Sequence, residues 1–209
     1  MAQFALLSDL AREIDAMGSL TAEYWDKQIH PVPASKTVDR VEYLQGLASK
    51  KTILHVGCTG HLDTALQAVA TKVYGLDATQ LDRPDYVQID LDHLSTLELP
   101  LFEGVELVVC GEVLEHLSNP GRFLLALQNT YPTQPVVFTV PNAFCLAGQE
   151  WLVKRGRENV NRDHVCYYSY TTLNTLLWRA HYDVKSHYWY GGRPYVSEGL
   201  IMLATPAKD

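Results

Sequence analysis

Short runs of apolar residues alternate with stretches of helical periodicity from residue 51 onward. Continuous apolar runs of this kind are typical of strands buried on both faces of a parallel sheet. The runs are 52–56, 72–76, 86–89, 105–110 and 135–140, and helical spacing is clearest between them at 61–71 and 121–130. Because crossovers between parallel strands are right-handed, the alternation predicts a doubly wound α/β sheet.

The pattern changes in the last quarter of the chain. A helix is predicted over 171–180, followed by apolar runs at 182–190 and 198–204. The connector between the two runs begins Gly191-Gly192-Arg193-Pro194, which favours a turn. Two strands joined in this way form a hairpin, so we expect an antiparallel edge strand to finish the sheet.

Helical patterning marks the first fifty residues. Apolar positions from Phe4 to Met17 recur at helical spacing, a short segment carries Tyr24 and Trp25, and a further helix is predicted over 35–48. The expected organisation is an N-terminal helical extension, residues 1–50, that covers the site of a single domain, residues 51–209.

Composition and charge exclude several classes of protein. The 209 residues are 47% hydrophobic and carry 17 basic against 24 acidic side chains, a net charge of −7. A disordered chain is therefore excluded, and a nucleic-acid partner is not expected, because phosphate binding needs a basic face. No apolar run reaches the roughly 20 residues of a membrane helix. Four well-separated cysteines without a CxxC pair favour a reduced, cytoplasmic protein.

Candidate binding residues follow the predicted strands. In doubly wound sheets ligands lie beyond the carboxyl ends of the strands. The first strand runs into a loop between Gly57 and Gly60, and the next three end at Asp77, Asp90 and Glu112. An acid about twenty residues after the first glycine suits a ribose diol. A tight turn or an aspartate cap would explain each residue singly, but their order and spacing together favour a nucleoside site.

Six segments give the chain a family likeness. Over roughly residues 50–205 it resembles the class I S-adenosylmethionine-dependent methyltransferases, in particular members that act on small molecules. The matching segments are HVGCTG (55–60), YGLDAT (74–79), VQIDLD (87–92), VELVVCGEVLEHLSNPGRFL (105–124), VVFTVPNAF (136–144) and DHVCYYSYTTLNTLLWRAHYDV (163–184).

The resemblance implies a seven-stranded sheet with its last strand antiparallel, S-adenosylmethionine as methyl donor and S-adenosylhomocysteine as product. It also implies a role for each strand end. The methionine part of the cofactor would lie against Gly57, Cys58, Thr59 and Gly60, the ribose against Asp77 and Ala78, the adenine against Asp90 and Leu91, and the methionyl end near the methyl against Gly111 and Glu112.

The first glycine loop departs from the family pattern. His55 stands where the family usually has an acid, and Thr59 stands where a second glycine is usual. Loss of the acid removes a partner for the methionyl ammonium, for which a backbone carbonyl could substitute.

Two histidines are candidate bases. Methyl transfer is an in-line displacement, so the enzyme must hold the nucleophile near the methyl group, and a base helps when the nucleophile is a hydroxyl. His116 is the first candidate and His164, with Asp163 as a possible partner, is the second. A structural role for His116 is the alternative. The expected reaction is O-methylation of a small-molecule acceptor.

A metal-dependent form of this reaction is an alternative to catalysis by a histidine base. Glu112, Glu115, His116 and His164 offer two carboxylates and two imidazoles, and some methyltransferases with a similar E-x-x-E-H string bind a divalent metal. The small-RNA terminal 2′-O-methyltransferases and the ubiquinone-pathway O-methyltransferases are examples. The same string occurs in many members that bind no metal, so no metal site is predicted.

Other interpretations stay open. The tyrosines at 167, 168 and 170 and the run Tyr188-Trp189-Tyr190 could line an acceptor pocket or fill the core. Gly57 and Asp77 would also suit a nicotinamide-dependent reductase, although the loop is not G-x-G-x-x-G. The altered glycine loop would suit a non-catalytic binding module.

Overall fold

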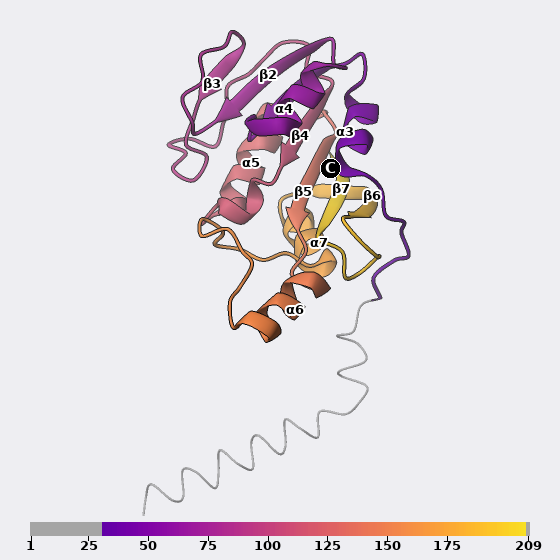
Figure 1. Ribbon diagram of the computed structural model, residues 1–209. Helices are drawn as coiled ribbons and strands as arrows, with labels where there is room; N and C mark the ends of the chain where they lie inside the picture. The colour runs from indigo at the N-terminus through magenta and orange to yellow at the C-terminus, as the bar shows by residue number, and fades with distance from the viewer. Residues whose placement is uncertain (1–30, 208–209) are drawn as a thin grey trace, which may run out of the picture. The chain divides into compact units, whose positions relative to one another are not determined.

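A computed structural model describes residues 31–207 of the chain (Figure 1). The sheet has seven strands in the order β3-β2-β1-β4-β5-β7-β6. These are β1 (Thr52–Val56), β2 (Lys72–Asp77), β3 (Tyr86–Gln88), β4 (Leu107–Gly111), β5 (Val136–Pro141), β6 (Tyr182–Tyr190) and β7 (Gly199–Pro206). The first five pair in parallel, and β7 is antiparallel to both of its neighbours. The predicted doubly wound, seven-stranded sheet is confirmed.

The position of the antiparallel strand differs from the expectation. β7 lies between β5 and β6, so that Met202 is opposite Phe138 on one side and His187 on the other. The outermost strand is therefore β6. Burial explains the order: β7 is buried along most of its length, whereas exposed positions recur along β6. A strand that is apolar on both faces gains most from the interior of a sheet.

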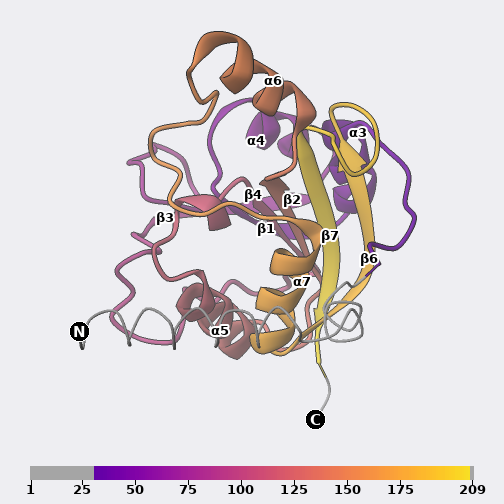
Figure 2. The same cartoon turned by 90° about the horizontal axis from the view of Figure 1, so that it is seen from below.

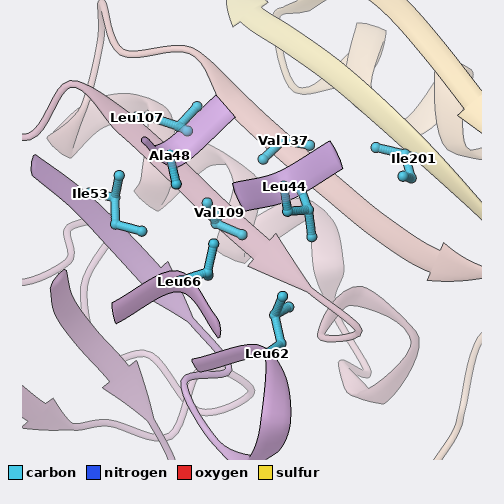
Figure 3. Close-up of a cluster of buried hydrophobic side chains, with 9 residues drawn as sticks. All are labelled: Leu44, Ala48, Ile53, Leu62, Leu66, Leu107, Val109, Val137 and Ile201. Carbon is cyan, nitrogen blue, oxygen red and sulfur yellow. The ribbon is translucent and has the colours of Figure 1, made fainter. Parts of the chain in front are cut away.

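Helices cover both faces of the sheet (Figure 2). On one face lie α3 (Arg40–Ala48) and α4 (Gly60–Gln67), and on the other lie α5 (Pro120–Thr130) and α7 (Tyr170–Arg179). The core beneath α3 and α4 uses alternate strand positions, for example Leu107 and Val109 of β4, as the period of two requires. Figure 3 shows this cluster: Leu44, Ala48, Ile53, Leu62, Leu66, Leu107, Val109, Val137 and Ile201.

Two elements were not predicted. The first is η1 (Leu114–His116), a single 3-10 turn after β4. The second is α6 (Leu146–Arg155), which ends at Gly156 with a φ of 60° and has no buried residue. α6 was not among the helices predicted from apolar periodicity, and no residue of it is buried against the sheet. Trp151, Leu152 and Val153 of α6 remain exposed.

The helix α3 begins later than predicted. Its N-cap is Asp39, whose side chain accepts a hydrogen bond from the backbone N–H of Glu42, so the helix begins at Arg40 rather than near 35. The compact unit that contains the sheet begins at residue 34 and includes α3. The predicted segments around Phe4–Met17 and Tyr24-Trp25 lie outside the described residues, and the extension 1–50 stays a prediction. Between residues 31 and 207, no helix combines the length and the apolar character needed to cross a membrane.

Candidate functional site

A cavity of about 730 Å³ opens at the carboxyl ends of β1, β2 and β4. This is the position at which ligands bind in doubly wound sheets. Most of the predicted cofactor residues line it: Gly57, Thr59, Asp77, Ala78, Asp90, Leu91, Gly111 and Glu112. His116 and Asp163 also line it, whereas His164 does not.

Close packing of β1 against β4 requires glycine at the cavity floor. Gly57 has a φ of 76°, and a Cβ there would lie 2.5 Å from Cγ2 of Val113 and 3.2 Å from the carbonyl oxygen of Gly111. A Cβ on Gly111 would lie 2.9 Å from Cδ2 of Leu62. Since neither site has room for a side chain, these glycines leave the backbone accessible to a ligand.

Two predicted cofactor residues are not part of the cavity lining. Cys58 is 1% exposed, and its thiol packs against Gly75 of β2, where an added Cβ would lie 2.6 Å from the sulfur. Burial raises the pKa of Cys58 to about 12, so this thiol is a core group. Gly60, with a φ of 71°, is the first residue of α4.

The acids at the strand ends are ordered by local hydrogen bonds. Asp77 accepts from the backbone N–H of Thr79 at 2.8 Å, and Asp90 accepts from that of Asp92 at 3.0 Å. Hydrogen bonds from His93 and from the Asp92 N–H lower the pKa of Asp90. A tight turn or a cap was the alternative explanation for each aspartate, and these hydrogen bonds are of that kind. Both carboxylates nevertheless line the cavity, where their oxygens can accept hydrogen bonds from a ligand.

His55 lies outside the cavity and belongs to a buried charge network. Its ring is fully buried, and Nδ1 donates to Oδ1 of Asp63 at 2.9 Å. Arg83 donates to the other oxygen of Asp63 at 2.6 Å. Burial raises the pKa of Asp63, but the hydrogen bonds from His55 and Arg83 outweigh it, and the net pKa is lowered. The residue that replaces the family's usual acid thus joins β1 to α4.

Glu112 is held by three groups at the junction of β4 with the cavity. Its Oε1 accepts from Thr139 and from Tyr190 at 2.8 Å each, and Nη1 of Arg40 lies 3.2 Å away. Glu112 has a φ of 55°, a conformation that side chains rarely adopt. These contacts hold the strained residue in place and leave Arg40, itself a lining residue, at the cavity wall.

A cluster of three potential metal ligands lies beside the cavity. A carboxylate oxygen of Glu115 and one ring nitrogen each of His116 and His164 all lie within 4.8 Å of one another. Glu115 is 1% exposed, and neither of its carboxylate oxygens has a hydrogen-bond partner. Burial, and then the charge of Glu112, raise the pKa of Glu115 to about 8. Burial and the neighbouring His116 lower the pKa of His164, which favours its neutral, metal-binding form.

Backbone hydrogen bonds bring His164 to this cluster. The carbonyl oxygen of Glu115 accepts from the N–H groups of Val165 and Cys166, at 2.8 and 3.1 Å. As a result, Nε2 of His164 lies 4.0 Å from Oε1 of Glu115. The suggested partner Asp163 donates its backbone N–H to the side chain of Asn161, and its charge acts on His164 in the direction that raises the pKa.

The aromatic residues divide between the core and the cavities. Tyr168 is buried and donates to the carbonyl oxygen of Leu114 at 3.2 Å, and Trp189 is 2% exposed. Tyr190 binds Glu112, as described above. Of the three tyrosines at 167, 168 and 170, Tyr167 is the one that lines a pocket, a second cavity considered below.

Three titratable residues of the first cavity were not predicted from the sequence. Arg40 was assigned to the extension, and neither its helix nor its spacing gave a signal of binding. His61 follows Gly60 at the start of α4 and also lines the cavity. Asp92 lines it too, and it accepts from the N–H and hydroxyl groups of Ser118, each at 2.7 Å. The acids repeated at 90 and 92 could have suggested a role for Asp92.

Comparisons with known proteins agree with this geometry. A family model described as a methyltransferase domain matches residues 25–187. The ubiquinone biosynthesis O-methyltransferase of Rickettsia felis is 25% identical over 138 residues, which are 56% of this chain and 54% of that protein. The enzyme of the same name from Dechloromonas aromatica is 28% identical over 133 residues, 54% of this chain and 55% of that protein. The chain thus spans about half the length of these relatives.

Solved structures share the fold at low sequence identity. The small RNA methyltransferase HEN1 superposes with a TM-score of 0.64 and 16% identity, over 87% of this chain and 27% of that one. The 1,6-didemethyltoxoflavin-N1-methyltransferase of Burkholderia thailandensis, solved with S-adenosylhomocysteine, gives a TM-score of 0.56 and 15% identity, over 80% of this chain and 76% of that one. The family match covers most of the chain, and the sheet and the glycines beneath the cavity agree with it, so the chain belongs to the methyltransferase-domain family.

Proposed function

We propose that this protein transfers the methyl group of S-adenosylmethionine to a hydroxyl oxygen of a small molecule, with the help of a divalent metal ion. The observation that carries the proposal is the buried Glu115 carboxylate, which has no hydrogen-bond partner and lies beside the imidazoles of His116 and His164. Ionisation of a buried carboxyl group that has no hydrogen-bond partner costs several kcal/mol, and the raised pKa of Glu115 reflects that cost. A cation between the three groups would remove that cost.

The donor set fits a divalent ion. One carboxylate oxygen and two imidazole nitrogens suit zinc, manganese or iron, and three protein ligands leave coordination positions free for substrate. A bound ion would lower the pKa of an acceptor hydroxyl and orient it. The E-x-x-E-H string by itself does not specify a metal, and none was predicted from the sequence. The proximity of His164 to Glu115 is what favours a metal ion here. Glu112, directed toward Arg40, Thr139 and Tyr190, is not part of the proposed ligand set.

The residues of the first cavity would bind the methyl donor. Asp77 would accept hydrogen bonds from the ribose hydroxyls, Asp90 would accept from the adenine amine, and Leu91 would pack beside the ring. Gly57 and Gly111 would allow the methionine part to approach the backbone, and Arg40 would bind its carboxylate. His116, which lines the same cavity, would lie near the reacting methyl. The acceptor oxygen would then face the sulfonium in the line that displacement requires.

Two further expectations belong to this proposal. The acceptor is a small molecule rather than nucleic acid, because the net charge of −7 opposes binding to a phosphate backbone; the likeness to a small RNA methyltransferase concerns the fold. A cytoplasmic location stays a prediction, supported by four cysteines that are all unpaired.

Calorimetry tests the proposal. We expect S-adenosylmethionine and S-adenosylhomocysteine to bind with similar affinity, and NADPH not to bind. A protein loaded with Mn²⁺ and dialysed should retain one ion per chain, and Glu115→Gln should retain none, while Glu103→Gln, on an exposed loop, should behave as wild type. Binding of NADPH alone would establish the reductase alternative, and binding of no nucleotide would favour the non-catalytic module.

A further inference from the structure

A second cavity, of about 410 Å³, lies between the end of β5, the helix α6 and the segment 158–167. It shares a boundary with the cofactor site: His164 lines the second cavity and His116 lines the first. The centroids of the two imidazole rings are 4.6 Å apart, with the rings nearly perpendicular. A ligand in either cavity can therefore reach the Glu115–His116–His164 cluster.

We infer that the second cavity is the acceptor site, and that it accepts an uncharged hydroxylated compound with an apolar body in preference to an anionic one. The inference rests on the proposed function, because the cluster at the boundary is where methyl donor and acceptor would meet. Its volume falls within the range of sites for small organic ligands.

The chemistry of the walls determines this preference. Leu152, Val160 and Tyr167 supply apolar surface to the cavity. Its charged lining residues are Glu158 and Glu198, with no lysine or arginine among the described residues that line it. Two carboxylates with no lysine or arginine beside them repel a carboxylate or phosphate group on the ligand, whereas the apolar walls favour a neutral ring.

The exposure of α6 agrees with this role. Leu152 of α6 is 45% exposed, and Tyr167, in the segment that follows α6, is 54% exposed. None of the side chains of α6 is buried, so the helix contributes little to the core. A helix that supplies apolar side chains to a cavity without packing in the core is expected where a ligand covers those side chains.

Steric occlusion tests the position of the site. Gly148 lines the cavity, and a Cβ on it would have its nearest neighbours at 3.9 Å, so Gly148→Trp places a large ring there without displacing the backbone. Val153→Trp adds the same ring to the outer face of α6, where Val153 is 86% exposed and lines neither cavity. The probes are catechol, the simplest neutral aromatic diol, and its anionic analogue 3,4-dihydroxybenzoate. Each is titrated calorimetrically into protein saturated with Mn²⁺ and S-adenosylhomocysteine.

We expect catechol to bind at least tenfold more tightly than 3,4-dihydroxybenzoate. Gly148→Trp should weaken catechol binding at least tenfold, and Val153→Trp should leave it unchanged. Both variants should bind S-adenosylhomocysteine like the wild type, which shows that they fold. Failure of the wild type to bind S-adenosylhomocysteine would instead contradict the proposed function. Normal nucleotide binding with no catechol binding, or with catechol affinity unaffected by Gly148→Trp, would overturn the acceptor site.

Charge reversal gives an independent test that does not depend on the packing of a tryptophan. Glu158 is exposed at the cavity lining, so Glu158→Lys should fold and should reduce the preference for catechol over 3,4-dihydroxybenzoate at least fivefold. Glu150→Lys, on α6 but outside both linings, is the matched control and should retain the wild-type preference. An unchanged preference in Glu158→Lys would overturn the charge argument.

Discussion

The imidazole rings of His116 and His164 lie 4.6 Å apart in an edge-to-face arrangement, although one follows β4 and the other follows α6. The backbone carbonyl of Glu115 holds the second segment against the first. Both rings therefore lie beside a buried carboxylate that has no hydrogen-bond partner. This relationship leads to the first of four predictions.

A divalent ion should stabilise the protein through this cluster. At Mn²⁺ concentrations a hundred times the dissociation constant, binding adds about 2.7 kcal/mol to the free energy of unfolding. For a chain of this size the melting temperature should rise by roughly 5 °C or more. Differential scanning calorimetry with Mn²⁺ and with EDTA measures the shift. Glu115→Gln and His164→Ala should abolish it, and His93→Ala, at an exposed imidazole, should not. An equal shift in all four proteins would contradict the ligand assignment.

Removal of the Asp77 carboxylate should weaken cofactor binding. Asp77 lines the cavity at the end of β2 and would accept two hydrogen bonds from the ribose. We expect Asp77→Ala to raise the dissociation constant of S-adenosylhomocysteine at least tenfold, since hydrogen bonds to a charged group contribute about 1.5–3 kcal/mol. Asp82→Ala, in the following loop and outside the lining, serves as the control. An unchanged constant in Asp77→Ala would reject the ribose contact.

Substitution of Arg40 should weaken only the binding of the methionine part of the ligand. Arg40 is at the cavity wall beside Glu112, far in sequence from the glycine loop. In Arg40→Gln we expect at least a fivefold loss of affinity for S-adenosylhomocysteine, because the ligand carboxylate loses its cation. Adenosine, which lacks that carboxylate, should bind the variant and the wild type equally. If adenosine binding falls by the same factor, Arg40 supports the structure of the whole cavity, and the proposed contact with the ligand carboxylate is wrong.

The Asp63 network should make stability depend on pH in the acid range. The pKa of Asp63 is lower in the folded protein than its ordinary value, which is about 3.9 in an unfolded chain. Such a group stabilises the fold above that pH, and the contribution is lost as the pH falls through the folded pKa. Asp63→Asn should therefore lower the free energy of unfolding at pH 7 by about 3–5 kcal/mol, as expected for breaking a buried pair.

Urea unfolding at several pH values measures this effect. The difference between Asp63→Asn and wild type should be greatest at pH 7 and should shrink below about pH 4. Asp85→Asn breaks the exposed pair with Lys72 and should cost less than about 1 kcal/mol. A difference for Asp63→Asn that is constant with pH would show that the carboxylate charge is not the source of the stability.

The sequence was sufficient for the sheet because a strand buried on both faces must be apolar throughout. β1, which is buried from Ile53 to Val56, was predicted to the residue at Thr52–Val56. β6 was also predicted to the residue, at Tyr182–Tyr190, although exposed positions recur along it. The strand-end positions of Gly57, Asp77 and Glu112 also followed from the sequence, since parallel strands bring their carboxyl ends to one edge. α6 was not predicted from the sequence, and the fold buries none of its residues.

Only the tertiary structure decided which of these residues act together. Nothing local to Glu115 indicates that Val165 and Cys166 donate to its carbonyl group, and so nothing local indicates that His164 approaches it. The orientation of His55 toward Asp63, of Arg40 toward Glu112 and of Cys58 into the core likewise depends on packing between distant segments. The sequence by itself determines the periodicity of burial, and with it the fold and the edge at which ligands bind. The proximity of side chains far apart in the chain, on which the proposed metal and acceptor sites depend, exists only once those elements have packed.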